Sequence, residues 1–253
     1  KPAPMSSMSS LFNENQDLPL AEKLRPQSFE EVIGQAHLLG EGKPLATYIQ
    51  HQKVPNLIFW GPPGCGKTTL ARLLAHIHAQ AHFLTTSALH SSVVDLRKIF
   101  EQAAADRQMG RVTYLFVDEI HRFNRAQQDC FLPVMEAGTL TLIGATTENP
   151  SFALNNALLS RAQVLTLTPL DQDDLRALLD QAEKKLGRTL PLTEEGRGRL
   201  TQLAQGDGRA LINMVESLHQ YTPADQSPLD AAQLGDWIQK KAPLYDKGQE
   251  QHY

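Results

Sequence analysis

Residues 57–69 read LIFWGPPGCGKTT, a short apolar run that enters a glycine-rich loop. The loop matches the phosphate-binding pattern G-x-x-x-x-G-K-[ST] at every fixed position, from Gly61 to Thr68. The amphipathic segment TTLARLLAHIHA continues from the loop with apolar residues at helical spacing. A strand, a loop and a helix in this order give the pattern the structural context that a chance glycine-rich turn would lack.

The composition of this loop predicts a site for ATP with Mg²⁺. Glycines let backbone N–H groups approach the phosphates, and the helix N-terminus adds positive potential. We expect Lys67 to reach the β and γ phosphates and Thr68 to give an oxygen ligand to Mg²⁺. Cys65 is interpreted as filler at a variable position, and redox sensitivity, which needs a lowered thiol pKa, is the alternative. The loop residues expected to contact the nucleotide are Gly61, Pro62, Pro63, Gly64, Cys65, Gly66, Lys67, Thr68 and Thr69.

Two acids end the apolar run VTYLFVDE, residues 112–119. Such a run is typical of a strand buried on both faces of a parallel sheet, and it places its acids at the carboxyl end. We expect Asp118 to hold Mg²⁺, directly or through water, and Glu119 to orient and activate the attacking water. The alternative is an acid pair that merely hydrates a loop. A small-molecule kinase needs no water-activating base, so the pair favours hydrolysis.

Strands and helices alternate along the first two thirds of the chain. The strands are expected in LIFW, FLTT, VTYLFVDE, TLTLIGATT and QVLTLTPL, and one helix at about 124–136 should be kinked at Pro133. Beyond Pro169 only helical periodicity remains, opened by a capping arrangement of Asp171 and Asp174. The predicted fold class is therefore α/β, a P-loop NTPase core with a parallel doubly wound sheet, followed by a small all-α lid.

A chain of 253 residues with 41% hydrophobic content suits one large domain and a smaller one. Residues 1–17 look like a tail, in which Met5 or Met8 resembles a native start. The remaining boundaries are expected at 18–170 for the nucleotide-binding domain, 171–242 for the helical lid, and 243–253 for the start of a linker to a further oligomerisation region.

The overall charge, the cysteine content and the hydropathy of the chain limit its possible partners and location. The net charge is -4 and the pI about 6.1, so any DNA contact must be local or created by assembly. Cys65 and Cys130 alone offer neither a disulfide framework nor a zinc site, which fits a reducing compartment. No apolar run approaches the roughly 18 residues of a membrane span, so we expect a cytoplasmic protein without a membrane partner.

Polar side chains and arginines follow the later strands. Thr146, Thr147 and Asn149 come at the carboxyl end of one strand, where a γ-phosphate would lie, although they also suit a strand and a turn. Arg161 follows the segment NNALLS, and Arg209 lies in GDGRAL at the start of a helix. An arginine stabilises charge on a transferring phosphoryl group, so both are candidates for a sensor or a finger, with surface arginines as the alternative.

Four stretches together resemble the clamp-loader branch of the AAA+ ATPases: GPPGCGKTTLA, LFVDEIHRFNRAQQD, LIGATTENPSFALNNALLSR and GDGRAL. Within that branch they are most similar to the replication-associated recombination ATPases, which are related to the Werner helicase-interacting ATPases. The resemblance covers roughly residues 18–253. The HRFN and GATTENPSF stretches are the most specific, because many unrelated NTPases share a phosphate loop.

The resemblance assigns further roles. It implies that Thr146 is sensor 1, with Thr147 and Asn149 as neighbouring candidates, that Arg161 is an arginine finger for the next subunit, and that Arg209 is sensor 2. It also implies an adenine-side box that contains Arg25, Pro26, Val32 and Ile33. Members of the family form oligomers, described as tetramers, and act on DNA at stalled or gapped forks with single-stranded DNA-binding protein, which implies a nucleoid-associated protein here.

Three functions remain open at this point. The leading hypothesis is an ATPase that remodels DNA at replication forks, in which ATP binding follows from the residues and DNA remodelling from the resemblance alone. The alternatives are a nucleotide-switched adaptor that recruits repair factors, and a clamp-loader-like subunit that opens a ring. DNA-stimulated hydrolysis separates the first from the second, and binding to a sliding clamp identifies the third.

Overall fold

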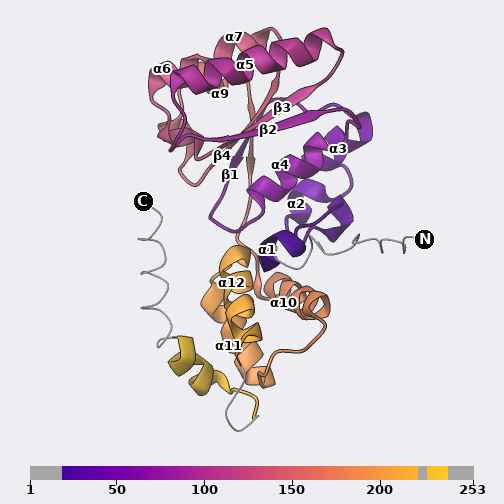
Figure 1. The fold of residues 1–253 in the computed structure, drawn as a ribbon, viewed down its shortest axis with the longest axis vertical. Coiled ribbons are helices and arrows are strands. Elements are labelled where there is room, and N and C mark those ends of the chain that lie inside the picture. Colours follow the sequence, from indigo (N-terminus) through magenta and orange to yellow (C-terminus); the bar gives the residue numbers. More distant parts are fainter. Residues whose placement is uncertain (1–18, 222–226, 239–253) are drawn as a thin grey trace, which may run out of the picture.

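The computed structural model describes residues 19–221 and 227–238, so the expected tail at 1–17 and linker at 243–253 lie outside the described residues. Figure 1 shows a sheet with its flanking helices at one end of the molecule and a smaller group of helices at the other. Among the described residues, no helix combines the length and the apolar composition that crossing a bilayer requires.

The sheet has five parallel strands in the order β2-β3-β4-β1-β5. The strands are β1 (Leu57–Trp60), β2 (His82–Ser87), β3 (Thr113–Asp118), β4 (Thr141–Thr146) and β5 (Gln163–Thr166). This arrangement confirms the predicted parallel sheet, because helices connect successive strands and return the chain to the same edge. Strand β4 pairs with both β1 and β3, so the carboxyl end of β4 lies between the phosphate loop and the acids.

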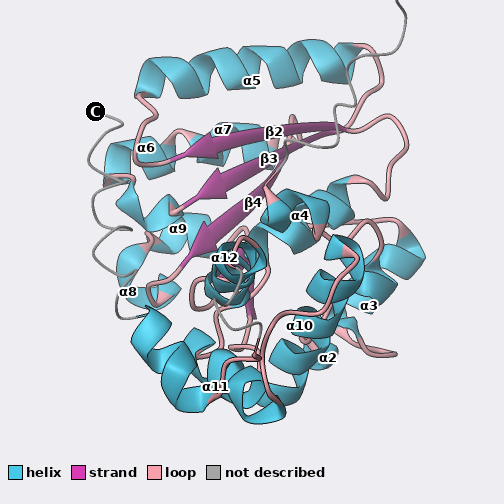
Figure 2. Ribbon diagram, turned by 60° about the horizontal axis from the view of Figure 1, so that its bottom comes forward, coloured by secondary structure: helices cyan, strands magenta, loops and turns pink. Residues whose placement is uncertain are grey.

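Helices cover both faces of the sheet because side chains along each strand alternate between the faces. Leu57 and Phe59 pack in one apolar cluster and Ile58 in another, on the opposite face. Figure 2 shows α4 on one side of the strands and α7 and α9 on the other. The first face carries α2 (Ala36–Leu39), α3 (Pro44–His51) and α4 (Lys67–Ala75), and the second carries α5 (Val93–Gln108), α6 (Arg125–Asp129), α7 (Phe131–Glu136) and α9 (Asn156–Leu159).

The single helix expected at about 124–136 is two helices, α6 and α7, which meet at Cys130. Pro133 has no N–H to donate to the carbonyl of residue 129, and its ring crowds that carbonyl, so the helix is interrupted one turn before the proline. Asn124 begins α6 with a capping box that includes Gln127. The predicted disturbance by Pro133 is confirmed, and it is a break between helices.

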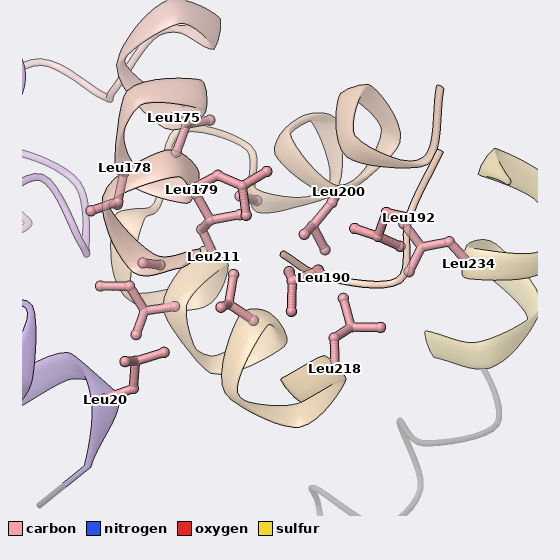
Figure 3. Close-up of a cluster of buried hydrophobic side chains, with 14 of the residues drawn as sticks. Leu20, Leu175, Leu178, Leu179, Leu190, Leu192, Leu200, Leu211, Leu218 and Leu234 are labelled. Atoms are coloured by element: carbon pink, nitrogen blue, oxygen red, sulfur yellow. The ribbon is translucent and has the colours of Figure 1, made fainter. Parts of the chain in front are cut away.

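The smaller group of helices contains α10 (Gln172–Leu186), α11 (Glu194–Ala204) and α12 (Gly208–His219), and here it is called the lid. Asp171 and Asp174 form the predicted capping box at the start of α10. Leucines from all three helices meet in one apolar core, in which Leu200 and Leu211 are fully buried (Figure 3). The lid is stable because each helix buries one apolar face against the other two.

The segment before the sheet divides its contacts between the two parts of the molecule. Helix α1 (Leu20–Lys23) packs against α12, and the backbone N–H of Leu20 donates to Glu216 at 3.1 Å. Leu20 also joins the leucine core of the lid (Figure 3). We had expected this segment to belong to the nucleotide-binding domain alone. Three further short helices are η1 (Phe29–Glu31), η2 (Ile120–Arg122) and α8 (Pro150–Ala153), and the described residues end in a helical segment at 231–238.

Candidate nucleotide-binding site

A pocket opens where the carboxyl ends of the strands, the N-terminal segment and the lid meet. Its lining comes from sequence segments that are far apart, which is common for ligand sites at a boundary between domains. The segments contribute Ala21, Leu24, Arg25, Pro26, Glu31, Val32 and Ile33, then Pro63 to Thr69, then Asp118, Glu119 and Thr147, and from the lid Leu170, Leu178, Gln181, Gly208, Arg209 and Ile212.

The phosphate loop has a backbone that requires glycine. Gly64 and Gly66 have φ angles of 69° and 102°, which residues with a Cβ adopt only with strain. A Cβ on Gly61 would lie 2.7 Å from the carbonyl oxygen of Leu167. Helix α4 starts at Lys67, directly after the loop, so the free N–H groups of its first turn face the pocket. The geometry is that of an anion-binding loop.

Lys67 is held against the loop that precedes it. Its ammonium donates to the carbonyls of Gly61 and Pro62 at 2.8 and 2.7 Å, and the residue is 9% exposed. Gly61 and Pro62 thus contribute their carbonyls to the internal contacts of the loop and do not line the pocket. The residues from Pro63 to Thr69 do line it. Burial raises the pKa of the Cys65 thiol, which favours a packing role for this side chain and not a reactive thiolate.

The acids Asp118 and Glu119 line the same pocket. Asp118 is the last residue of β3, and its carboxylate accepts the backbone N–H of Glu119 at 3.1 Å. Glu119 adopts a left-handed conformation, with φ 51° and ψ 43°. Such a backbone is unusual for glutamate and recurs at functional sites.

The residues fit Mg²⁺ as a cofactor. Thr68 and Asp118 both line the pocket and offer the oxygen ligands that Mg²⁺ prefers. The described residues contain no group of three or more histidines, cysteines or acids that could hold a metal. The two oxygen ligands from Thr68 and Asp118 suit Mg²⁺, which takes one or two protein ligands and completes its shell with water and phosphate oxygens.

The structure distinguishes the three candidates for sensor 1. Thr147 lines the pocket, whereas Thr146 is fully buried and its hydroxyl contacts His121 at 2.9 Å. Asn149 caps α8 by accepting the backbone N–H of Ser151 and does not line the pocket. Of the three side chains, Thr147 is thus the one placed to contact a bound nucleotide, and this differs from the expectation that favoured Thr146.

The side of the pocket away from the acids is largely apolar. Val32 and Ile33 of the expected adenine box line it, as do Arg25 and Pro26. The lid adds Leu178, Gln181 and Ile212, which sequence reasoning missed because their helical spacing indicated only a packed face. Apolar side chains around a few polar groups are typical of a site for a planar base.

The lid touches the phosphate loop directly. The backbone N–H of Gly208 donates to the carbonyl of Gly64 at 3.2 Å, and Asp207 caps α12 by accepting the N–H of Ala210 at 3.0 Å. Arg209 is exposed and faces the pocket from the first turn of α12. This contact brings the expected sensor 2 arginine to the same cavity as the loop.

Arg161 lies elsewhere. It precedes β5, and its carbonyl accepts from the side chain of Asn56, which precedes β1. Arg161 is therefore at the amino end of the parallel strands, whereas the pocket is at the carboxyl end, and a four-residue strand spans about 13 Å. Its guanidinium donates to Glu136 and to the carbonyl of Ala157. Arg161 is not positioned to act on the pocket of its own chain.

Sequence reasoning also missed two polar residues beside Glu119. The side chain of His121 is 2% exposed, and its Nε2 atom lies 3.1 Å from Glu119 and 3.4 Å from Glu148. The only sequence signal was that His121 follows the acid pair closely in DEIHRFN.

Two family models match this chain. Residues 57–170 match the ATPase family associated with various cellular activities (AAA), and residues 183–253 match the AAA C-terminal domain. The two matches correspond to the sheet with its pocket loops and to the greater part of the lid with the residues that follow it.

Curated relatives extend this likeness. Replication-associated recombination protein A of Escherichia coli K12 is 46% identical over 228 residues, which cover 88% of this chain and 51% of the relative. The protein of the same name from Haemophilus influenzae is 42% identical and covers 98% of this chain and 57% of the relative. The chain thus spans about half the length of these relatives.

Among solved structures, a RuvB variant from Thermotoga maritima superposes with a TM-score of 0.71, at 23% identity, over 86% of this chain and 73% of that one. This likeness shows the fold.

Proposed function

This chain contains an AAA ATPase domain followed by an AAA C-terminal domain, and from that premise we propose that it binds ATP with Mg²⁺ and hydrolyses ATP to remodel DNA at stalled or gapped replication forks. The observation that carries the proposal is the single pocket that unites the phosphate loop, the acids Asp118 and Glu119, Thr147 and the lid residue Arg209.

In this proposal each group acts on one part of the nucleotide. The loop amides and Lys67 bind the β and γ phosphates, for which the ammonium must exchange its contacts with the carbonyls of Gly61 and Pro62. Thr68 and Asp118 hold Mg²⁺, which when bound neutralises charge that develops on the phosphate oxygens. Glu119 orients the attacking water and accepts its proton.

Two further groups report the state of the γ-phosphate. Thr147 lines the pocket at the end of β4 and contacts the phosphate or the attacking water. Arg209 binds it from α12, so that nucleotide binding fixes the lid against the loop. Positive charge from an arginine is most effective on a phosphoryl group in transfer.

Arg161 completes the site of a neighbouring subunit. Its place at the amino end of the strands supports this role, because the arginine is far from its own pocket and exposed for contact with another chain. Assembly is therefore part of the proposed function, as a homo-oligomer that is tetrameric when the protein is full length.

DNA as the partner is supported by the names of the relatives and not by charge. The relatives are named for replication-associated recombination, and the net charge of -4 requires a local basic surface or one built by assembly. We include single-stranded DNA-binding protein as a further partner, and a cytoplasmic, nucleoid-associated location, on the family resemblance of the sequence motifs alone.

The test is ATP hydrolysis by the full-length protein with and without forked DNA. Lys67→Ala should abolish ATP binding, Glu119→Gln should bind ATP without turnover, and Arg161→Ala should bind ATP and lose turnover. An equimolar mixture of Lys67→Ala and Arg161→Ala should regain activity, because one subunit then has an intact pocket and its neighbour an intact finger.

Two results would count against the proposal. Hydrolysis that ignores forked DNA, with no recovery on mixing, would favour a nucleotide-switched adaptor. Equal loss of ATP binding in all three variants would show that the pocket residues do not divide their roles as described.

A further inference from the structure

His121 is the most enclosed polar side chain beside the candidate base. It lies in η2, directly after the acids, and its side chain is 2% exposed. The Nδ1 atom contacts the hydroxyl of Thr146 at 2.9 Å. The Nε2 atom lies 3.1 Å from Oε2 of Glu119 and 3.4 Å from Oε1 of Glu148. The imidazole therefore links the end of β4 to the residue proposed to activate water.

The Nε2 atom has close neighbours but no well-directed hydrogen bond, although it is buried. Two carboxylates thus lie close to this nitrogen, and neither is aligned with it for a hydrogen bond. A buried polar atom without a hydrogen bond lowers the stability of the fold. Such an atom is expected where the protein also adopts an arrangement in which the hydrogen bond forms. The two carboxylates differ in freedom, because the Glu119 side chain is 27% exposed and that of Glu148 is 58% exposed.

Thr146 fixes the other side of the ring. Its hydroxyl accepts the backbone N–H of Glu148 at 3.0 Å, and its one proton can be donated either to the carbonyl of Glu148 at 3.2 Å or to Nδ1 of His121 at 2.9 Å, which is the nearer acceptor. A hydroxyl that donates to Nδ1 leaves the proton of a neutral imidazole on Nε2, where it faces the carboxylates. The next residue, Thr147, lines the pocket. The end of β4 is therefore connected to Glu119 through two buried side chains.

We propose that His121 is a positioning residue for hydrolysis, which holds the Glu119 carboxylate through Nε2–H and couples its orientation to the end of β4 through Thr146. The inference rests on the proposed function, since it gives Glu119 the role of base. Glu148 is the competing acceptor, so the imidazole N–H keeps a partner in any state in which Glu119 is not held. A base that is held in one orientation needs less reorganisation in the transition state.

The ordinary reading of a buried histidine is that it only stabilises the fold. Apolar contacts and one satisfied hydrogen bond would support that reading. Here both ring nitrogens face polar groups of the site, and the nearest carboxylate belongs to the candidate base. The two readings differ in whether catalysis or stability responds to a change at Nε2.

Two substitutions separate the nitrogens of the ring. His121→Asn keeps an amide near the position of Nδ1 and removes the group at Nε2, whereas His121→Gln places its amide near Nε2. We expect His121→Asn to lower kcat by about 10- to 100-fold, in the range of outer-shell partners at active sites, with the Kd for ATP unchanged. His121→Gln should recover part of this loss. The matched control is His82→Asn, the same substitution at a histidine that contacts a carboxylate, Asp106, through Nδ1 outside the pocket.

A double-mutant cycle shows whether His121 acts through Glu119. Single-turnover hydrolysis is measured for full-length protein carrying His121→Asn, Glu119→Gln and both changes, with ATP binding and thermal unfolding measured in parallel. We expect no additional loss from His121→Asn once Glu119 is replaced. Independent, multiplying losses would overturn the proposal. So would an unchanged kcat with weaker ATP binding and a lower Tm, which would leave His121 a structural role alone.

The ring itself gives a readout that does not depend on turnover. In ¹⁵N-histidine spectra of the full-length protein, Glu119→Gln should shift the Nε2 resonance of His121, and His82→Asn should leave it in place. An Nε2 chemical shift that is the same in Glu119→Gln and in the unsubstituted protein would overturn the inference. Failure of the unsubstituted protein to bind ATP would instead refute the proposed function, because the two results are read from different signals.

Discussion

Replacing Gly64 by alanine tests the contact between the phosphate loop and the lid. A Cβ at this position would lie 1.7 Å from Oδ1 of Asp207, far inside van der Waals contact. The backbone of Gly64 also has a φ of 69°, which penalises any residue with a Cβ. Gly66→Ala is the matched control, because Gly66 has a φ of 102° and its Cβ would meet nothing within 4 Å.

The expected cost has two parts. Left-handed strain costs about 1–2 kcal/mol in both variants. In Gly64→Ala the Asp207 side chain must also move and give up its cap on α12, at a further cost of about 1 kcal/mol. The total for Gly64→Ala is therefore about 2–3 kcal/mol, which lowers the urea midpoint by roughly 1–1.5 M at a typical m-value.

Urea unfolding without nucleotide measures these terms, and Asp207→Gly isolates the second one. Glycine substitutes for aspartate at an N-cap at a cost of a few tenths of a kcal/mol, so Asp207→Gly alone should be mild. In the Asp207→Gly background Gly64→Ala should cost less, because only its strain and the 2.9 Å approach of its Cβ to the backbone nitrogen of Gly208 remain, whereas Gly66→Ala should cost the same in both backgrounds. If Gly64→Ala and Asp207→Gly add to within about 0.5 kcal/mol, the loop and the lid are not in contact and the reasoning is wrong.

Three further predictions follow from single sites. Leu211→Ala should lower the free energy of unfolding by about 2–5 kcal/mol in urea titrations, because this lid leucine is fully buried. The hydrogen bond with His82 holds the pKa of Asp106 below its ordinary value. The stability that this carboxylate contributes is therefore present at neutral pH and is lost as the pH falls through the lowered pKa. Asp106→Asn should make the free energy of unfolding depend less on pH in the acid range. Thr147→Val should lower the rate of hydrolysis at unchanged stability, whereas Thr146→Val should destabilise the protein in thermal unfolding; the reverse pattern would restore Thr146 as the sensor.

The sequence predicted most where a site residue directly follows a local pattern, such as an apolar strand. The strand before the phosphate loop and the strand before Asp118 are apolar along their length because helices cover both faces of the sheet. Each strand ends at a charged or glycine-rich segment, so its carboxyl end could be located without coordinates. The interruption near Pro133 was equally local, since it depends on one missing N–H.

The choice between Thr146 and Thr147 as sensor 1 could not be made from the sequence, because of the period of a strand. Side chains on a strand alternate between two environments, so a shift of one residue exchanges a buried hydroxyl for an exposed one. Thr146 and Thr147 are identical in type and adjacent, and no feature of the sequence says which of them faces the pocket. Only the register of β4 between its two neighbours decides this.

The other contacts that the sequence did not predict depend on packing between distant segments. The short helix that contains Leu20 carries too few residues for a periodic pattern, and its partner α12 is nearly 200 positions away. The same holds for Glu148, which approaches His121 only because β4 is inserted next to β3. Contacts between distant segments depend on strand order, and a single sequence does not state that order.

The places of the pocket and of Arg161 constrain the form of any active assembly. The pocket lies at the carboxyl end of the sheet and Arg161 at its amino end, so one subunit must present its amino end to the carboxyl end of the next. A two-fold dimer would need the pocket and Arg161 within one self-complementary patch, whereas they lie at opposite ends of the strands. The proposed trans action therefore requires a head-to-tail interface, which forms a ring when the rotation closes. A tetramer built in this way has one four-fold axis. In a mixture of Lys67→Ala and Arg161→Ala subunits, activity returns only at interfaces where the intact pocket of an Arg161→Ala subunit faces the intact arginine of a Lys67→Ala subunit.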